Sequence, residues 1–194
     1  VFVRASGCNL RCWFCDTSYA SWQPEGQDYA VDEIIAEIEE WDCRHVVITG
    51  GEPMLFAELI PLCRELQDRG RHITIETAGT LYLPAACDLM SISPKLAGSG
   101  PNPERHPRWA RRHERDRYRP EVLARLMAEY DFQLKFVVDQ PGDIAEIEQL
   151  LLPAPQQPER TRTGRQPLPD HLPRIEHRHE PQSCQCKQCG SELI

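Results

Sequence analysis

The sequence has 194 residues, enough for one domain of ordinary size with an appendage but too few for two full catalytic domains. It carries 22 basic and 30 acidic side chains, and the net charge of −8 argues against a general role on nucleic acid or on an anionic membrane. No stretch approaches the roughly 18 consecutive apolar residues of a membrane span, and no secretory signal is visible, so we expect a soluble, cytoplasmic protein.

Strand-like and helix-like stretches alternate along most of the chain. In chain order we expect a strand at 1–5, a helix at 31–41, a strand at 45–49, a helix from about 55 to 69, strands at 73–76 and 88–93, a helix at 121–130, a strand at 133–138 and a helix at 144–152. A long polar connection precedes the third helix. This alternation predicts an α/β fold with about five strands in a mostly parallel sheet.

Proline usage divides the chain. Ten Pro residues occur in the first 152 residues and seven in the last 42, where turns and extended segments should replace a packed core. We therefore expect a domain at 1–152 and a Pro-rich, mostly irregular tail at 153–194. Because the chain begins at Val1 inside an expected strand and without an initiator Met, we also expect the domain to be truncated at its N-terminus.

Polar or glycine-containing loops follow four of the expected strands, at 8–17, 49–53, 77–80 and 93–95. In parallel βα folds, reactive groups gather on the loops that follow the carboxyl ends of the strands. We therefore expect these four loops to share one mouth.

The first loop contains Cys8, Cys12 and Cys15 in a C-x3-C-x2-C pattern with no fourth Cys or His close by. A structural zinc site needs four protein ligands, whereas three thiolates leave one metal position for a water, a substrate or a cofactor. Soft thiolates suit zinc and iron–sulfur alike, so the spacing alone leaves both open.

The second loop has the sequence Thr49-Gly50-Gly51-Glu52-Pro53. Paired glycines let the backbone approach a ligand closely, and the acidic side chain beside them can accept hydrogen bonds from an amine. An isolated Gly-Gly pair also forms ordinary tight turns. Turn chemistry alone, however, does not explain why a three-cysteine loop follows one strand and this loop follows the next.

Together these motifs resemble the radical S-adenosylmethionine (SAM) superfamily, in which a C-x3-C-x2-C loop holds a [4Fe-4S] cluster and leaves one iron for the cofactor. Over roughly residues 1–152, the sequence resembles the 7-carboxy-7-deazaguanine synthase family within it. The similar segments are Phe2-Val3-Arg4, Gly7-Cys8-Asn9-Leu10, Cys15-Asp16-Thr17, Thr49-Gly50-Gly51-Glu52-Pro53, Glu76-Thr77-Ala78-Gly79-Thr80, Ser93-Pro94-Lys95 and Leu134-Lys135-Phe136-Val137-Val138. Among them, Arg4, Cys15-Asp16-Thr17 and Ser93-Pro94-Lys95 carry the narrower resemblance. The resemblance implies a partial (β/α) barrel of the radical SAM type.

The resemblance also implies an activity. It is that of a carbon–nitrogen lyase converting 6-carboxy-5,6,7,8-tetrahydropterin into 7-carboxy-7-deazaguanine and ammonia, in queuosine and deazapurine biosynthesis. The implied cofactors are a [4Fe-4S] cluster, SAM and Mg2+. The implied partners are an electron donor such as flavodoxin and a second copy of the chain in a homodimer.

Particular residues receive roles from the same resemblance. Cys8, Cys12 and Cys15 would ligate the cluster and Thr17 would ligate Mg2+, while Arg4 and Thr49 would line the pterin site. The residues that would line SAM are Phe14, Cys15, Asp16, Gly51, Ser93, Pro94, Lys95, Gln133, Leu134, Lys135 and Phe136.

Several of these residues have a plainer interpretation. Arg4 could pair with a surface acid, and Lys95 could be an exposed loop residue. Thr17 could be a turn residue, and Lys135 could point outward from its strand because it alternates with apolar neighbours.

The segment from Arg105 to Arg119 contains seven Arg residues with Glu114 and Asp116 between them. We interpret it as a solvated loop and helix face, because the chain is acidic overall and few aromatic residues accompany the arginines. We therefore expect no nucleic-acid binding by this domain.

Two features depart from the family pattern. The sequence given lacks the Gln-Gly-Glu-Gly segment that usually precedes the first strand, and no family-like portion follows residue 152. Instead, residues from about 155 to 194 resemble the start of the zinc-binding segment of IS66-type transposases, and Cys186 and Cys189 have the spacing of a zinc knuckle.

These departures leave alternatives to an active synthase. One is an inactive chimera or a zinc-binding, transposase-derived remnant that binds DNA through its tail. Another is a radical SAM activase that acts on a protein partner. Iron rather than zinc in the cysteine loop would favour an enzyme, and cofactor cleavage stimulated by the carboxypterin would disfavour the activase.

Overall fold

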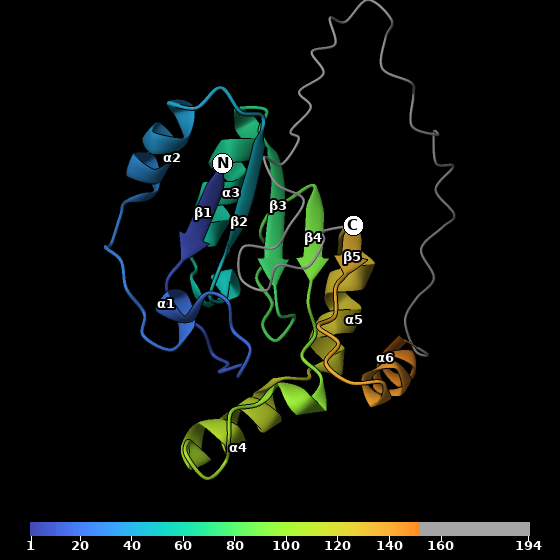
Figure 1. The fold of residues 1–194 in the computed structure, drawn as a ribbon. Coiled ribbons are helices and arrows are strands. Elements are labelled where there is room, and N and C mark those ends of the chain that lie inside the picture. The colour runs from blue at the N-terminus through green and yellow to red at the C-terminus, as the bar shows by residue number, and fades with distance from the viewer. Residues whose placement is uncertain (152–194) are drawn as a thin grey trace, which may run out of the picture. The chain divides into compact units, whose positions relative to one another are not determined.

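The computed structural model describes residues 1–151, so the expected tail lies outside the described residues. Within them, five parallel strands form one sheet in the order β1-β2-β3-β4-β5, so that neighbours in sequence are neighbours in space (Figure 1). The strands are β1 (Phe2–Ala5), β2 (His45–Gly50), β3 (His72–Thr77), β4 (Leu89–Ile92) and β5 (Phe132–Leu134). This confirms the expected α/β fold and its five parallel strands.

Helices connect β1 to β2, β2 to β3 and β4 to β5, while a segment without a helix connects β3 to β4 and a further helix follows β5. The helices are α1 (Ser18–Ser21), α2 (Val31–Glu39), α3 (Leu59–Asp68), α4 (Pro107–Asp116), α5 (Pro120–Glu129) and α6 (Gly142–Leu151), together with the short 3-10 helices η1 (Pro53–Leu55) and η2 (Ala97–Ser99). Among residues 1–151, none of these helices is long and apolar enough to cross a membrane.

The helix expected from about residue 55 is interrupted in the structure. It is divided into η1 and α3, and α3 begins at Leu59. Pro61 explains this start, because a residue without an N–H group is tolerated in the first turn of a helix but breaks its interior.

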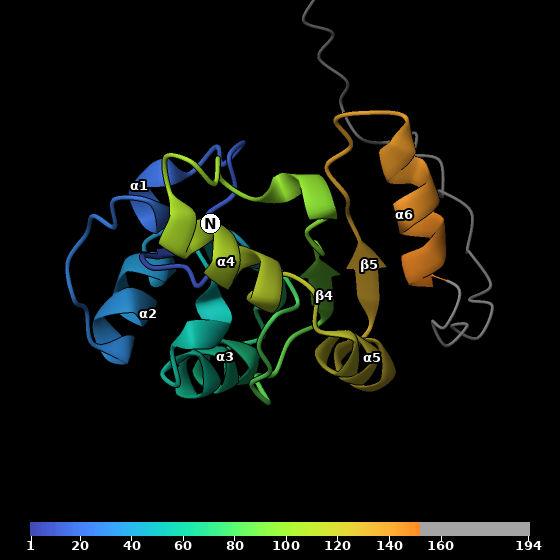
Figure 2. The ribbon, with the colours of Figure 1, turned by 90° about the horizontal axis from the view of Figure 1, so that it is seen from below.

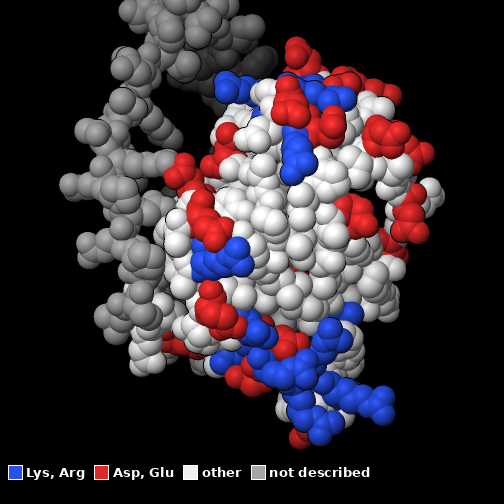
Figure 3. All heavy atoms as spheres, turned by 180° about the vertical axis from the view of Figure 1, so that it is seen from behind, with Lys and Arg blue, Asp and Glu red and all other residues white. Residues whose placement is uncertain are grey.

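Helix α4 fills part of the expected polar connection. Its buried side consists of His113, with Trp109 and Ala110 half-buried, so no apolar stripe marks it in the sequence. Its other side carries exposed arginines, and basic side chains gather at this end of the described region (Figure 3). This agrees with the interpretation of the segment as a solvated helix face.

The hydrophobic core lies on one face of the sheet, under α2, α3 and α5 (Figure 2). Ile73 and Ile75 of β3 are fully buried there. Because successive side chains of a strand point to opposite faces, Thr74 and Glu76 lie on the face away from these helices.

A row of polar residues crosses that second face. Arg4 is paired in register with Thr49, and Glu76 with Ser91, which is paired in turn with Gln133. The hydroxyl of Thr49 donates to Glu76 at 2.7 Å, and the amide of Gln133 donates to Ser91 Oγ at 2.9 Å. One polar row therefore spans all five strands.

The fifth strand is shorter than expected. Residues 135–138 were expected to continue it, but β5 ends at Leu134, and the N–H of Lys135 makes a last hydrogen bond to Ile92 O at 2.8 Å. Its partner β4 ends at Ile92, and Pro94 has no N–H to extend the ladder. The segment after Lys135 therefore lacks a strand to pair with within the described residues.

The core assignment can be tested at Leu126, which lies on α5 and is fully buried. Replacing it with Ala should lower the free energy of unfolding by about 2–5 kcal/mol, because the lost side chain leaves a cavity. Urea denaturation measures this change. Val138→Ala, at a position that is 49% exposed, should change the stability by less than about 0.5 kcal/mol; equal effects would contradict the core assignment.

Candidate active site

The loops after β1 to β4 line one cavity of about 350 Å³ at the carboxyl ends of the strands. The shared mouth expected from the sequence is therefore present. The cavity wall includes ten of the residues singled out from the sequence: Cys8, Cys12, Phe14, Cys15, Asp16, Thr49, Gly51, Ser93, Lys95 and Lys135.

Six other predicted residues do not line this cavity. Arg4 is exposed on β1, with its guanidinium 5.4 Å from the ring centroid of Phe2. The hydroxyl of Thr17 donates to Asp16 at 2.8 Å at the start of α1. The roles assigned to Arg4 and Thr17 remain predictions.

The remaining four are neighbours of cavity residues in the sequence or contact one of them. Gln133 contacts the cavity wall indirectly, since its amide donates to Ser91, which does line the cavity. Leu134 packs against the hydrophobic core, Pro94 is buried, and Phe136 is half-buried. For Leu134 the strand alternation gives the reason, because it places this side chain on the helix-covered face.

The cysteine loop is held by backbone contacts. The N–H of Gly7 donates to Ala20 O at 2.8 Å, and the carbonyl of Gly7 accepts from Glu52 N at 2.8 Å. Burial raises the pKa of the Cys8 thiol to about 11 and that of Cys12 to about 12. Both are therefore neutral thiols in the metal-free chain.

The three thiols suit a soft metal centre by their chemistry. Cys8, Cys12 and Cys15 are all free cysteines and all reach the same cavity. Three thiolates on one loop form the donor set of an iron–sulfur cluster with one open position. Among residues 1–151, no three Cys, His, Asp or Glu side chains converge as the ligands of a metal ion do.

The paired glycines bring the second loop against the first. A Cβ atom on Gly51 would lie 2.0 Å from Gly7 O and 2.6 Å from Ala20 O. Gly50 has φ +111°, and a Cβ there would lie 2.3 Å from Ala5 O. No side chain fits at either position, so these glycines are required for the close approach of this segment to β1 and to the loop that follows β1.

Glu52 has a different role from the one its position suggested. Its side chain is fully buried, and its oxygens accept hydrogen bonds from Met54 N at 3.1 Å, Thr77 Oγ1 at 2.8 Å and Ala78 N at 2.9 Å. Burial raises the pKa of this carboxyl, and the three donors oppose that rise. The carboxylate therefore joins the second loop to the end of β3 and is not available to an external amine.

Glu76 is a cavity residue to which the sequence analysis gave no role. It accepts hydrogen bonds from Thr49 at 2.7 Å and from Lys135 Nζ at 2.6 Å. Desolvation raises its pKa, but these hydrogen bonds and the positive charges of Lys135 and Arg4 outweigh it, so the pKa is lowered overall. The alternation in β3, with Ile73 and Ile75 facing the core, was the signal that could have identified it.

Lys95 lies in the cavity wall as a half-buried side chain. Its ammonium donates to Ser93 O at 2.6 Å and to Ser93 Oγ at 2.8 Å. Burial lowers its pKa, while the nearby Cys12 and Glu52 oppose this shift. Lys135 also lines the cavity and reaches Glu76, so neither lysine behaves as a surface residue without contacts.

Comparison with known proteins places this geometry in a family. The model of the radical SAM superfamily matches residues 2–119, more than half of the chain, and includes the cysteine loop. The chain belongs to the radical SAM superfamily. As a radical SAM protein, it has its three cysteines on the loop after the first strand of the sheet.

Curated relatives show which proteins within the superfamily the chain is similar to. The 7-carboxy-7-deazaguanine synthase of Halobacterium salinarum is 49% identical over 156 residues, covering 78% of this chain and 61% of the relative. That of Rhodopirellula baltica is 44% identical over 152 residues, covering 78% of this chain and 59% of the relative. The chain thus spans about three fifths of the length of these relatives. The crystal structure of QueE from Escherichia coli superposes with a TM-score of 0.58 at 25% identity, covering 81% of this chain and 70% of that one.

A second family model, described as transposase C of IS166 homeodomain, matches residues 105–176. It overlaps the radical SAM match at 105–119 and extends into the segment that resembles IS66-type transposases. Up to Leu151 the matched residues form α4, α5, β5 and α6, and β5 is a strand of the main sheet. The proposed zinc-knuckle cysteines lie outside the described residues.

The contact between the two loops can be tested at Gly51. Gly51→Ala should lower the free energy of unfolding by about 1–3 kcal/mol, because the new Cβ overlaps the carbonyls of Gly7 and Ala20. Gly98→Ala is the matched control, since nothing lies within 4 Å of a Cβ there. Urea denaturation of both variants measures the difference, and a Gly51 variant as stable as the Gly98 variant would contradict this packing.

Proposed function

We propose that this chain is a 7-carboxy-7-deazaguanine synthase, which converts 6-carboxy-5,6,7,8-tetrahydropterin into 7-carboxy-7-deazaguanine and ammonia in queuosine and deazapurine biosynthesis. The observation that carries the proposal is the single cavity that holds the three thiols together with polar groups of the sheet. Further support comes from the two relatives of that name, which are 49% and 44% identical to the chain.

The cysteine loop would hold the metal centre. Cys8, Cys12 and Cys15 would bind a [4Fe-4S] cluster and leave one iron for SAM. When bound, the cluster and SAM would supply the radical chemistry that removes a hydrogen from the pterin. Since Cys8 and Cys12 are neutral thiols in the metal-free chain, both would release their protons on loading.

The cofactor side of the cavity would be formed by the loops around the cysteines. Phe14 and the backbone at Gly51 would exclude water, while Lys95 and Ser93 would present hydrogen-bond donors. The other proposed cofactor-lining residues are Asp16, Pro94, Gln133, Leu134, Lys135 and Phe136. Thr17 would offer its hydroxyl oxygen to Mg2+, a hard cation that prefers oxygen ligands.

The polar row on the sheet would hold the substrate. Arg4 would bind the pterin carboxylate with its planar guanidinium, which suits two parallel hydrogen bonds. Thr49, paired with Arg4 in register, would contact the ring. Glu76 lies next along the row, and its lowered pKa keeps the carboxylate ionised, so that it can accept a hydrogen bond from a ring N–H.

Two partners complete the proposal. An electron donor such as flavodoxin would supply the reducing electron, because the chain needs a source of electrons for each reductive cleavage. A homodimer is inferred from the family resemblance alone. A molar mass of twice that of the chain, measured by light scattering, would support it.

Anaerobic reconstitution tests the proposed cluster. With iron and sulfide, the full chain should bind about four irons, and with SAM, a reductant and the carboxypterin it should form the deazaguanine product. Cys12→Ala should lose the iron, since it removes one of three ligands, whereas Cys87→Ala, at a half-buried cysteine outside the loop, should retain it. Iron analysis and product detection measure both. Zinc binding without iron would contradict the proposal and favour the zinc-binding remnant.

The role of Arg4 can be tested by kinetics. Arg4→Ala should raise the KM for the carboxypterin by about tenfold to a hundredfold, because it removes charge-assisted hydrogen bonds to the carboxylate. The iron content should not change, since Arg4 lies outside the cysteine loop. Arg4→Lys should recover part of the affinity, because it keeps the charge but not the planar pair of donors. An unchanged KM for the Ala variant would remove Arg4 from the substrate site.

A further inference from the structure

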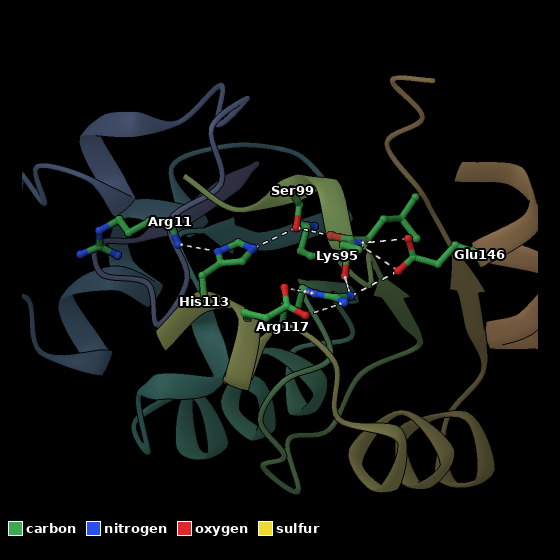
Figure 4. A network of polar contacts seen from close by, with 9 residues as sticks. Arg11, Lys95, Ser99, His113, Arg117 and Glu146 are labelled. Atoms are coloured by element: carbon green, nitrogen blue, oxygen red, sulfur yellow. Dashed lines mark hydrogen bonds and ion pairs between the residues drawn. The ribbon is translucent and has the colours of Figure 1, made fainter. Parts of the chain in front are cut away.

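Helix α4 contacts the cysteine loop through two side chains, Trp109, whose ring centroid lies 3.9 Å from the Arg11 guanidinium carbon, and His113. His113 is fully buried, and its Nδ1 atom accepts a hydrogen bond of 3.1 Å from the backbone N–H of Arg11, the residue before Cys12 (Figure 4). The loop has no helix or strand structure at this point, so its amide groups need partners from elsewhere. The imidazole of His113 supplies one of these partners.

The other ring nitrogen contacts η2. His113 Nε2 lies 2.9 Å from Ser99 Oγ, and the Ser99 hydroxyl donates to Leu96 O at 2.6 Å. Because that hydroxyl has one proton and gives it to the carbonyl, Nε2 must carry the ring proton and donate it to Ser99. Nδ1 is then free to accept from Arg11. Burial lowers the pKa of His113 to about 4, which agrees with a neutral ring.

Ser99 belongs to η2, which follows Ser93-Pro94-Lys95 closely. The same short helix also meets the cysteine loop directly, since Trp13 N donates to Ser99 O at 3.1 Å and Trp13 Nε1 donates to Gly98 O at 3.0 Å. The imidazole therefore lies between the loop that carries the cysteines and the segment that follows Lys95.

The beginning of this segment is held by a second set of contacts. Arg117, just after α4, donates to Lys95 O at 3.1 Å and to Glu146 of α6 at 3.3 Å. Glu146 in turn accepts from Ala97 N at 2.9 Å, and Glu114 holds the Arg117 guanidinium through two hydrogen bonds of 2.8 Å. The segment after Lys95 is thus fixed at several points, and His113 connects it to the cysteine loop.

We propose that His113 is a positioning residue that fixes the Arg11-Cys12 part of the cysteine loop relative to the Ser93–Lys95 loop. The inference rests on the proposed function, because those two loops would hold the cluster and SAM. A rigid ring with an acceptor on one side and a donor on the other spans the distance between two loops that have no strand pairing with each other. Without it, the Arg11 N–H would be a buried donor with no acceptor, and the Arg11-Cys12 part of the loop would lose one of the contacts that hold it.

Two substitutions separate positioning from mere filling of space. The side-chain oxygen of Asn lies near the place of Nδ1, so His113→Asn keeps an acceptor for Arg11. The amide of Gln lies near the place of Nε2, so His113→Gln keeps a partner for Ser99 but leaves Arg11 without an acceptor. Both replace the ring by a smaller polar side chain, and circular dichroism would establish that both variants fold.

The first measurement is the hydrogen exchange rate of the Arg11 backbone amide in the full, metal-free chain, monitored by NMR. The second is the rate at which a chelator removes iron from the reconstituted chain. The Gln variant should accelerate Arg11 exchange and iron loss by about tenfold each, as expected for one lost hydrogen bond. The Asn variant should remain within about threefold of the wild type, and the exposed Arg111→Gln on the same helix should match the wild type.

The outcomes distinguish the two proposals. Equal effects of Asn and Gln in exchange and iron loss would overturn the positioning role, as would no effect of Gln. If the wild-type chain takes up no iron, the proposed function fails, and the exchange of Arg11 alone then decides whether His113 holds the loop.

Discussion

The structure depends on one constraint, the parallel pairing of five strands in chain order. Because all of them run in the same direction, their carboxyl ends meet at one edge of the sheet, and loops from distant parts of the sequence enclose a single cavity. The register also sets the polar row, in which Arg4 lies opposite Thr49 and Glu76 opposite Ser91. A shift of one residue in β3 would turn Glu76 toward the helices and place Ile75 in the cavity wall.

A second level of organisation comes from contacts between the loops. Gly51 and Gly50 allow the second loop to touch the first, and Glu52 then ties it to the end of β3 through three hydrogen bonds. A buried carboxylate is tolerated there because every donor is placed by backbone or by a neighbouring hydroxyl. The result is a cavity whose walls are fixed to one another before any ligand enters.

The sequence was informative where local patterns decide the structure. The helix expected at 31–41 and the strand expected at 73–76 correspond to α2 and β3, and the spacing of Cys8, Cys12 and Cys15 predicted the loop that reaches the cavity. It was less informative for α4, whose buried side depends on His113, and for the end of β5, which depends on where β4 stops. The roles of Glu52 and His113 arise from partners 25 and 102 residues away, and no local pattern announces such contacts.

The two outermost strands of the sheet, β1 and β5, differ in how well they could pair with another chain. Within the described residues, β1 and β5 each pair along one side only, so backbone amide and carbonyl groups along their outer sides remain open to another extended chain. The three-residue β5 offers little length for such pairing, whereas β1 has four residues and carries Phe2, which is 62% exposed. Among the described residues, β1 is therefore the edge that offers an additional strand the longer template.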